Sequence, residues 1–140
     1  MEHICYNSGY KYQLKATYTL ATKLIPISPI DTSYITLDAQ GTLTVLKGYA
    51  WDGPSGPTID TKTFMRGALV HDALYQLMRD CPTQLPEDPY RMQADQLLRT
   101  ICLEDGMNAI RAWWVYKAVR KFGKPSADPA KTRPPEWAPS

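Results

Sequence analysis

The first fifty residues interleave apolar and polar positions in the short pattern of β-strands. Residues 10–20 (YKYQLKATYTL) are rich in Tyr, Thr and Leu, a composition typical of strands. Residues 33–37 and 42–46 flank a turn in which Gly41 can supply the positive φ of a short hairpin loop. They predict a β-hairpin, whereas residues 26–31, with two prolines, predict a loop or an edge strand.

The pattern changes after the hairpin. Residues 49–57 (YAWDGPSGP) hold two glycines and two prolines, which predicts an irregular loop with no strand or helix. Apolar residues then recur at helical spacing, and Gly106 and Gly123 stand where the second and third helices should end. We expect helices from Thr61 or Thr63 to about Arg79, from about Pro89 to Glu104, and from Asn108 to Phe122.

These elements predict an α+β fold in one domain, residues 1–123. It has a small antiparallel β-sheet at the N-terminus followed by three helices. Residues 124–140 are rich in proline and charge, so we expect an extended tail there. The 140 residues, of which 44% are hydrophobic and 21% charged, suit one domain with a true core.

Charge and cysteine content narrow the possible partners and compartment. The net charge of +2 is too small to indicate a nucleic-acid partner, and none is expected. Three cysteines without a close pair argue against a disulfide framework or a zinc ribbon. We find no signal peptide and no stretch of membrane-spanning length. We therefore expect a protein kept in the cytoplasm or released by a non-secretory route.

The candidate chemistry lies on the first two helices. His71 and Tyr75 are four residues apart and share a helix face, and Asp72 points in an adjacent direction. Asp95, next to Ala94, lies near the packed face of the second helix. A short break between the helices makes them antiparallel neighbours, so Asp95 can reach His71. Histidine is the natural general base near neutral pH, and a carboxylate on its far nitrogen fixes the tautomer.

A metal is a further possibility at this site. Asp72, with carbonyl oxygens of the glycine- and proline-rich loop, offers the oxygen ligands that a hard cation such as calcium prefers. Such a cation would polarise a carbonyl or phosphoryl oxygen while His71 activates water.

The helices resemble a known enzyme family. Residues 67–75 (GALVHDALY), 88–90 (DPY) and 94–95 (AD) look like the catalytic helices of phospholipase A2, above all the compact, disulfide-free form of parvovirus capsid proteins. The resemblance implies that His71 is the base, Asp95 its partner and Tyr75 a hydrogen-bond donor to that partner. It also implies a calcium site at Asp72 and the loop glycines Gly53 and Gly56.

The whole chain resembles a second family, small phage and prophage proteins of unknown function. The shared features are an Asp-Gly-x-Ser-x-Pro-like loop at residues 52–57, His-Asp-x-x-Tyr at 71–75, Ala-Asp at 94–95 and a last helix ending in Arg-x-Phe-Gly at 120–123. This resemblance implies a phage origin, and a location in the host cytoplasm or the virion.

Three functional hypotheses follow. The first is a phage-encoded, metal-assisted hydrolase of a lipid-type ester, with calcium as its metal and a lipid or membrane surface as its substrate. The second is a non-enzymatic virion, assembly or host-interaction protein, with phage or host proteins as partners and a structural His-Asp pair. The third is a hydrolase of another bond, in peptidoglycan or a nucleotide. An open cleft over His71 and Asp72 would favour an enzyme.

Overall fold

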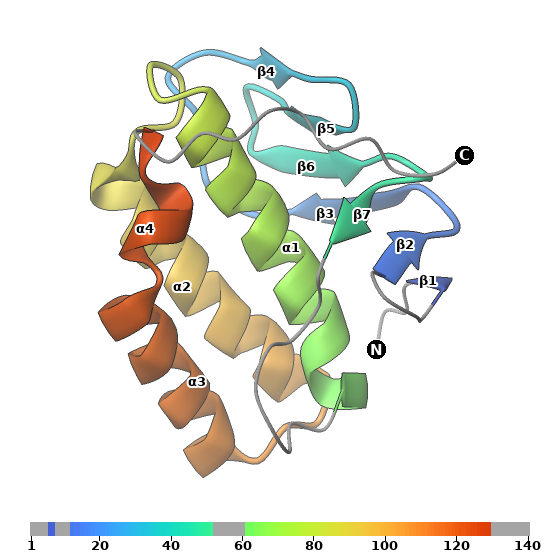
Figure 1. Ribbon diagram of the computed structural model, residues 1–140, viewed down its shortest axis with the longest axis vertical. Helices are drawn as coiled ribbons and strands as arrows, with labels where there is room; N and C mark the ends of the chain where they lie inside the picture. The colour runs from blue at the N-terminus through green and yellow to red at the C-terminus, as the bar shows by residue number, and fades with distance from the viewer. Residues whose placement is uncertain (1–5, 8–11, 52–60, 130–140) are drawn as a thin grey trace.

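A computed structural model describes residues 6–7, 12–51 and 61–129 of the chain. Within these residues, short antiparallel strands form one layer, and four helices form the other (Figure 1). This arrangement confirms the predicted α+β fold. The helices are α1 (Thr61–Asp80), α2 (Glu87–Glu104), α3 (Ala109–Phe122) and α4 (Lys124–Ala127). None of the helices in the described residues is both long and apolar enough to span a membrane.

The strands of the described segments form two sheets. The four-stranded sheet has the order β3-β6-β5-β4, and the three-stranded sheet has the order β1-β2-β7. All pairs are antiparallel. The strands are β1 (Tyr6–Asn7), β2 (Tyr12–Leu14), β3 (Tyr18–Ala21), β4 (Ile30–Asp31), β5 (Ile35–Leu37), β6 (Thr42–Val45) and β7 (Ala50–Trp51).

The predicted hairpin is confirmed and the predicted edge segment holds a strand. Leu37 of β5 lies opposite Leu43 of β6, and Gly41 in the turn has φ +84°. β4 lies at the edge of its sheet. The strand-like stretch over residues 10–20 holds β2 and β3, which exposed residues 15–17 separate and which belong to different sheets.

The loop predicted from Tyr49 begins instead with a strand. Ala50 and Trp51 form β7, which pairs with Gln13 and Tyr12 of β2. Trp51 is buried and its indole ring stacks on Tyr49, with ring centroids 6.2 Å apart. Burial of this large aromatic side chain stabilises the pairing of the segment with the sheet. The remainder of the predicted loop, residues 52–57, lies outside the described residues.

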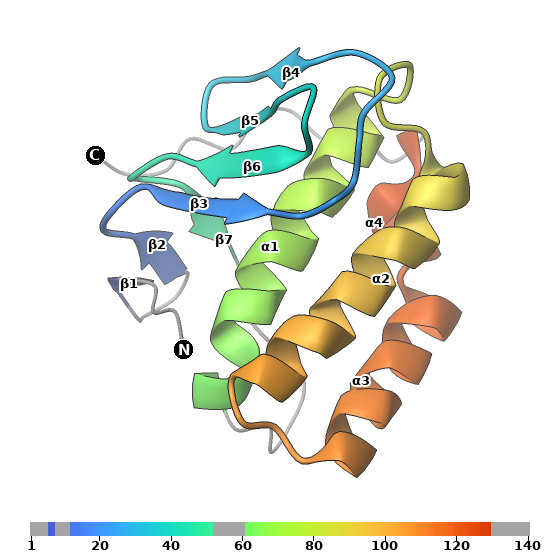
Figure 2. The ribbon, with the colours of Figure 1, turned by 180° about the vertical axis from the view of Figure 1, so that it is seen from behind.

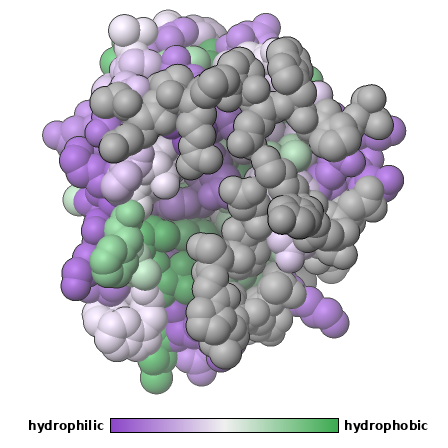
Figure 3. All heavy atoms as spheres, in the orientation of Figure 1, coloured by the Kyte–Doolittle hydropathy of each residue, from purple (hydrophilic) through white to green (hydrophobic). Residues whose placement is uncertain are grey.

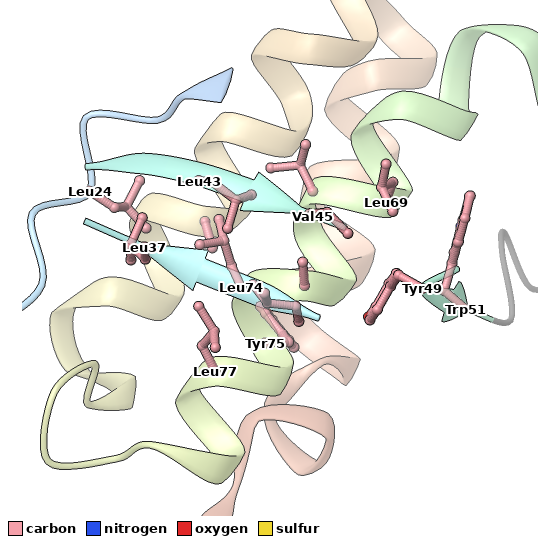
Figure 4. Packing of buried hydrophobic residues seen from close by; sticks show 14 of the residues in the cluster. Leu24, Leu37, Leu43, Val45, Tyr49, Trp51, Leu69, Leu74, Tyr75 and Leu77 are labelled. Atoms are coloured by element: carbon pink, nitrogen blue, oxygen red, sulfur yellow. The ribbon is translucent and has the colours of Figure 1, made fainter. Parts of the chain in front are cut away.

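The core lies between the four-stranded sheet and α1. In both views of the ribbon, α1 runs between the sheet and α2 (Figures 1 and 2). Val45 and the leucines of β5 and β6 meet leucines of α1, as the close view shows (Figure 4). Each fully buried leucine contributes about 2 kcal/mol to folding. The residues labelled at this contact are Leu37, Leu43, Val45, Leu69, Leu74 and Leu77.

A buried ion pair fixes the N-terminal part of α1. The Arg66 guanidinium donates to both carboxylate oxygens of Asp105 at 3.0–3.2 Å and to the Tyr18 hydroxyl at 2.9 Å. Arg66 and Asp105 are both buried. A buried pair needs such complete hydrogen bonding to offset desolvation. Arg66 thereby joins the start of α1 to the end of α2 and to the sheet.

The predicted extended tail is wrong for its first residues. Residues 124–127 form the short helix α4, whose Ala127 is fully buried. Arg79 Nη1 of α1 also donates to the carbonyl of Ser126 at 2.9 Å. These contacts offset the entropy lost when the segment becomes ordered. The predicted tail residues 130–140 lie outside the described part of the chain.

Candidate active site

The predicted triad of side chains meets between α1 and α2. His71 Nε2 lies 2.7 Å from Asp95 Oδ1. The Tyr75 hydroxyl donates to the same carboxylate oxygen at 2.5 Å. The rings of His71 and Tyr75 also contact each other, with centroids 4.0 Å apart. The structure therefore brings together all three residues proposed for catalysis.

Local sequence explains why these side chains meet. His71 and Tyr75 are one helical turn apart, and Ala94 and Leu98 flank Asp95 with buried apolar side chains. Gly67 allows the two helices to approach closely, because a Cβ atom there would lie 2.9 Å from Leu98 Cδ1. The close approach lets the short Asp95 side chain cross the helix interface.

Arg120 of α3 completes the site, and sequence reasoning missed it. Its Nη1 donates to Asp95 Oδ2 at 2.9 Å, opposite the oxygen that His71 contacts. A basic residue in the last turn of a helix is already accounted for by the helix dipole, so Arg120 by itself does not indicate a site. A usable signal was present, because Arg120 follows buried Ala112 by eight residues and so lies at the margin of the packed face.

Arg91 fixes the end of the helix that carries Arg120. Its Nη2 donates to the carbonyls of Val119 and Arg120 at 2.7 and 2.9 Å. These carbonyls belong to the last turn of α3, and the carbonyl of Val119 also accepts from the Gly123 N–H at 2.9 Å. Arg91 therefore positions the backbone from which Arg120 reaches Asp95.

Asp95 is an ionised carboxylate held entirely inside the protein, with an exposed fraction of 0%. Burial by itself raises the pKa of Asp95. The hydrogen bonds from its neighbours and the charge of His71 outweigh burial and lower this pKa below its ordinary value. Burial and the nearby carboxylate raise the pKa of Tyr75, so its hydroxyl stays protonated and remains a donor.

The environment of His71 favours the imidazolium. Burial by itself lowers the pKa of His71, but the attraction of Asp72 and Asp95 outweighs burial, so the pKa lies above 6.5. Asp72 Oδ1 lies 4.0 Å from the second ring nitrogen, Nδ1, too far for a direct hydrogen bond. It acts on His71 through its charge.

The hydrogen bonds assign the tautomer of neutral His71. The Asp95 carboxylate only accepts, so Nε2 carries the proton and Nδ1 keeps the lone pair. Nδ1 lies on the side of Asp72, whose side chain is 41% exposed, while Nε2 points to a carboxylate that is fully buried. The imidazole side chain is 9% exposed. The basic nitrogen is thus the one nearer the surface.

The described residues provide one candidate calcium ligand. Within them, no group of three or more His, Cys, Asp and Glu side chains is placed to hold a metal. Asp72, a half-buried carboxylate beside the base, has the right chemistry, but calcium takes six to eight oxygen ligands. Gly53 and Gly56, the other predicted ligands, lie outside the described residues.

Comparisons with known proteins identify a family but no activity for it. No curated protein and no solved structure is significantly similar to the chain. A family model described as "Protein of unknown function (DUF1353)" matches residues 30–119. The match covers more than half of the chain and includes His71, Tyr75 and Asp95. The chain therefore belongs to this family of proteins of unknown function.

Proposed function

We propose that the protein is a hydrolase of lipid-type esters in which His71 is the general base. The observation that carries the proposal is the orientation of His71. Its Nε2 is held at 2.7 Å by a fully buried carboxylate, and its Nδ1 lies on the side of half-exposed Asp72. An imidazole held in this way keeps one nitrogen available to accept a proton.

The reaction follows from this orientation. Nδ1 takes a proton from water as the water oxygen attacks the ester carbonyl carbon and a tetrahedral intermediate forms. The intermediate then collapses, the carbon–oxygen bond to the alcohol breaks, and the imidazolium returns its proton to the leaving oxygen. Asp95 stabilises the imidazolium between the two steps. Tyr75 and Arg120 hold Asp95 in place, because each donates a hydrogen bond to a different oxygen of its carboxylate.

Two resemblances support the substrate and the origin. The phospholipase A2 resemblance gives His71, Asp95 and Tyr75 the same three roles and suggests an ester of lipid type. The resemblance to phage and prophage proteins suggests that the gene is phage-encoded. Calcium belongs to the proposal through Asp72, together with Gly53 and Gly56. When bound, it would polarise the ester carbonyl.

The burial of the site favours a second candidate. The His71 side chain is only 9% exposed, and every oxygen of Asp95 has a hydrogen-bond donor. A network satisfied in this way also serves to tie helices together. In that case the protein is a virion, assembly or host-interaction component of a phage, with no catalytic step.

Hydrolysis assays on matched variants separate the two candidates. We expect wild-type protein to release fatty acid from phospholipid with calcium present, and His71→Asn to lose this activity while unfolding in urea as a single cooperative transition. Asp72→Asn should abolish calcium binding in calorimetry. Asp80→Asn, which changes an exposed carboxylate on the same helix, should alter neither property. Wild-type protein that neither binds calcium nor hydrolyses lipid would favour the structural candidate.

A further inference from the structure

The outer face of α3 carries an unusual stripe of side chains. Ile110, Trp113, Trp114, Lys117 and Lys121 recur at helical spacing and are all exposed. The buried residues of this helix, Ala112 and Val115, lie on the opposite side. We call the five exposed residues the α3 stripe. Along the helix axis the stripe is about 16 Å long.

The apolar part of the α3 stripe is large. The exposed fractions are 69% for Ile110, 40% for Trp113 and 61% for Trp114, and Phe122 at the end of the helix is 71% exposed. Single exposed apolar residues are common, but a contiguous group marks an interaction surface. In the space-filling view, apolar and near-neutral side chains lie among hydrophilic ones over the region of α3 (Figure 3).

The charge of α3 has one sign. The helix contains four basic residues and no acidic residue. Lys117 Nζ lies 5.6 Å from the centre of the Trp113 ring, and Lys121 Nζ lies 5.3 Å from that of Phe122. Each ammonium group therefore lies beside an exposed aromatic ring, and a partner that contacts the ring also meets the charge.

We infer that the α3 stripe binds an anionic lipid surface. Tryptophan and isoleucine suit the boundary between head groups and acyl chains, and lysines beside them meet lipid phosphates. A second copy of the chain is a poorer occupant, because a two-fold contact would oppose the basic stripe with itself. The inference rests on the proposed function, because it names the surface on which a lipid-ester hydrolase would act.

The same helix reaches the candidate site. The last turn of α3 carries Arg120, which donates to Asp95. A Cβ atom added at Gly123 would lie 2.9 Å from the Tyr75 hydroxyl. The binding face and the site therefore share one rigid element, and attachment of α3 to a membrane would hold the site at a fixed distance from it.

Vesicle sedimentation tests the inference without requiring hydrolysis. Full-length protein should bind vesicles of phosphatidylglycerol and phosphatidylcholine more tightly than vesicles of phosphatidylcholine alone, and about 0.5 M salt should weaken the difference. Each lysine at an anionic surface contributes about fivefold to binding. Lys117→Gln with Lys121→Gln should therefore weaken binding about 25-fold. The matched control, Lys15→Gln with Lys47→Gln, removes the same charge from exposed sites elsewhere and should leave binding nearly unchanged.

Trp114→Ala tests the apolar part of the stripe, and should weaken vesicle binding by about tenfold or more.

Three outcomes would overturn the inference. If the Lys117/Lys121 and Lys15/Lys47 double variants lose vesicle binding equally, binding depends on net charge and not on the α3 stripe. Binding of a single-stranded oligonucleotide in place of vesicles would overturn it, as would a dimer that Trp114→Ala dissociates. Turnover of a soluble short-chain ester distinguishes the two proposals. Turnover without vesicle binding refutes only the α3 surface, and vesicle binding without any turnover refutes only the hydrolase.

Discussion

Replacement of Asp95 by asparagine perturbs the site with almost no change of shape. Asp95 accepts from His71 and Tyr75 on one oxygen and from Arg120 on the other. Arg120 can only donate, whereas neutral His71 and Tyr75 can also accept. We therefore expect the introduced amide to turn its oxygen toward Arg120 and its nitrogen toward His71. Neutral His71 would then accept at Nε2 and carry its proton on Nδ1, which is the wrong tautomer for a base.

The loss of stability on this change can be worked out from the bonds. The bonds to His71 and Tyr75 become neutral ones, and the bond from Arg120 loses its charged acceptor, so each of the three loses about 1 kcal/mol. The free energy of unfolding should fall by about 3 kcal/mol at a pH between the lowered pKa of Asp95 and the raised pKa of His71, where both groups of the wild-type pair are charged. Turnover should fall by about 10⁴, the effect of the same replacement in a Ser-His-Asp triad.

Two measurements check the Asp95→Asn prediction. Urea unfolding followed by circular dichroism gives the stability, and ¹⁵N NMR of the imidazole gives the tautomer. The exposed Asp80→Asn control should lose less than about 0.5 kcal/mol. The reasoning is refuted if Asp95→Asn loses under about 1 kcal/mol and neutral His71 still carries its proton on Nε2.

Three further predictions concern charges in the core. Arg66→Met should lower the free energy of unfolding by about 3–5 kcal/mol in urea titrations, because it leaves the buried Asp105 carboxylate unpaired. The stabilisation from the His71–Asp95 pair should be largest between about pH 4 and 6.5 in a series of urea titrations. It is lost as pH rises through the raised pKa of His71, and as pH falls through the lowered pKa of Asp95. Arg120→Met should raise the NMR-measured pKa of His71 further, since it removes a nearby positive charge; an unchanged value would contradict the network.

Local patterns were sufficient to predict much of the fold. The hairpin depends on Gly41 and on strand alternation close to it in sequence, and the three long helices depend on spacing, caps and terminal glycines. The pairing of β7 with β2 joins residues nearly forty apart, and nothing in the segment around Trp51 signals it. The same holds for α4, whose order comes from contacts with α1 and from the buried Ala127.

The site was predictable to the same degree. His71 and Tyr75 are set by one helical turn, and the antiparallel arrangement of α1 and α2 brings Asp95 to them. Helical spacing places Arg120 at the margin of the packed face of α3, but no local pattern shows that its long side chain reaches Asp95 across the helix interface. Gly53 and Gly56 remain predictions, as does calcium.

The pH dependence of lipid-ester hydrolysis by the wild-type protein tests the central claim most directly. If His71 is the base, kcat/KM should rise with pH through a single ionisation with a midpoint above 6.5, because the pKa of His71 is raised. The midpoint should match the value obtained for His71 by NMR. An absence of turnover at every pH, or a midpoint unrelated to the titration of His71, would contradict the account.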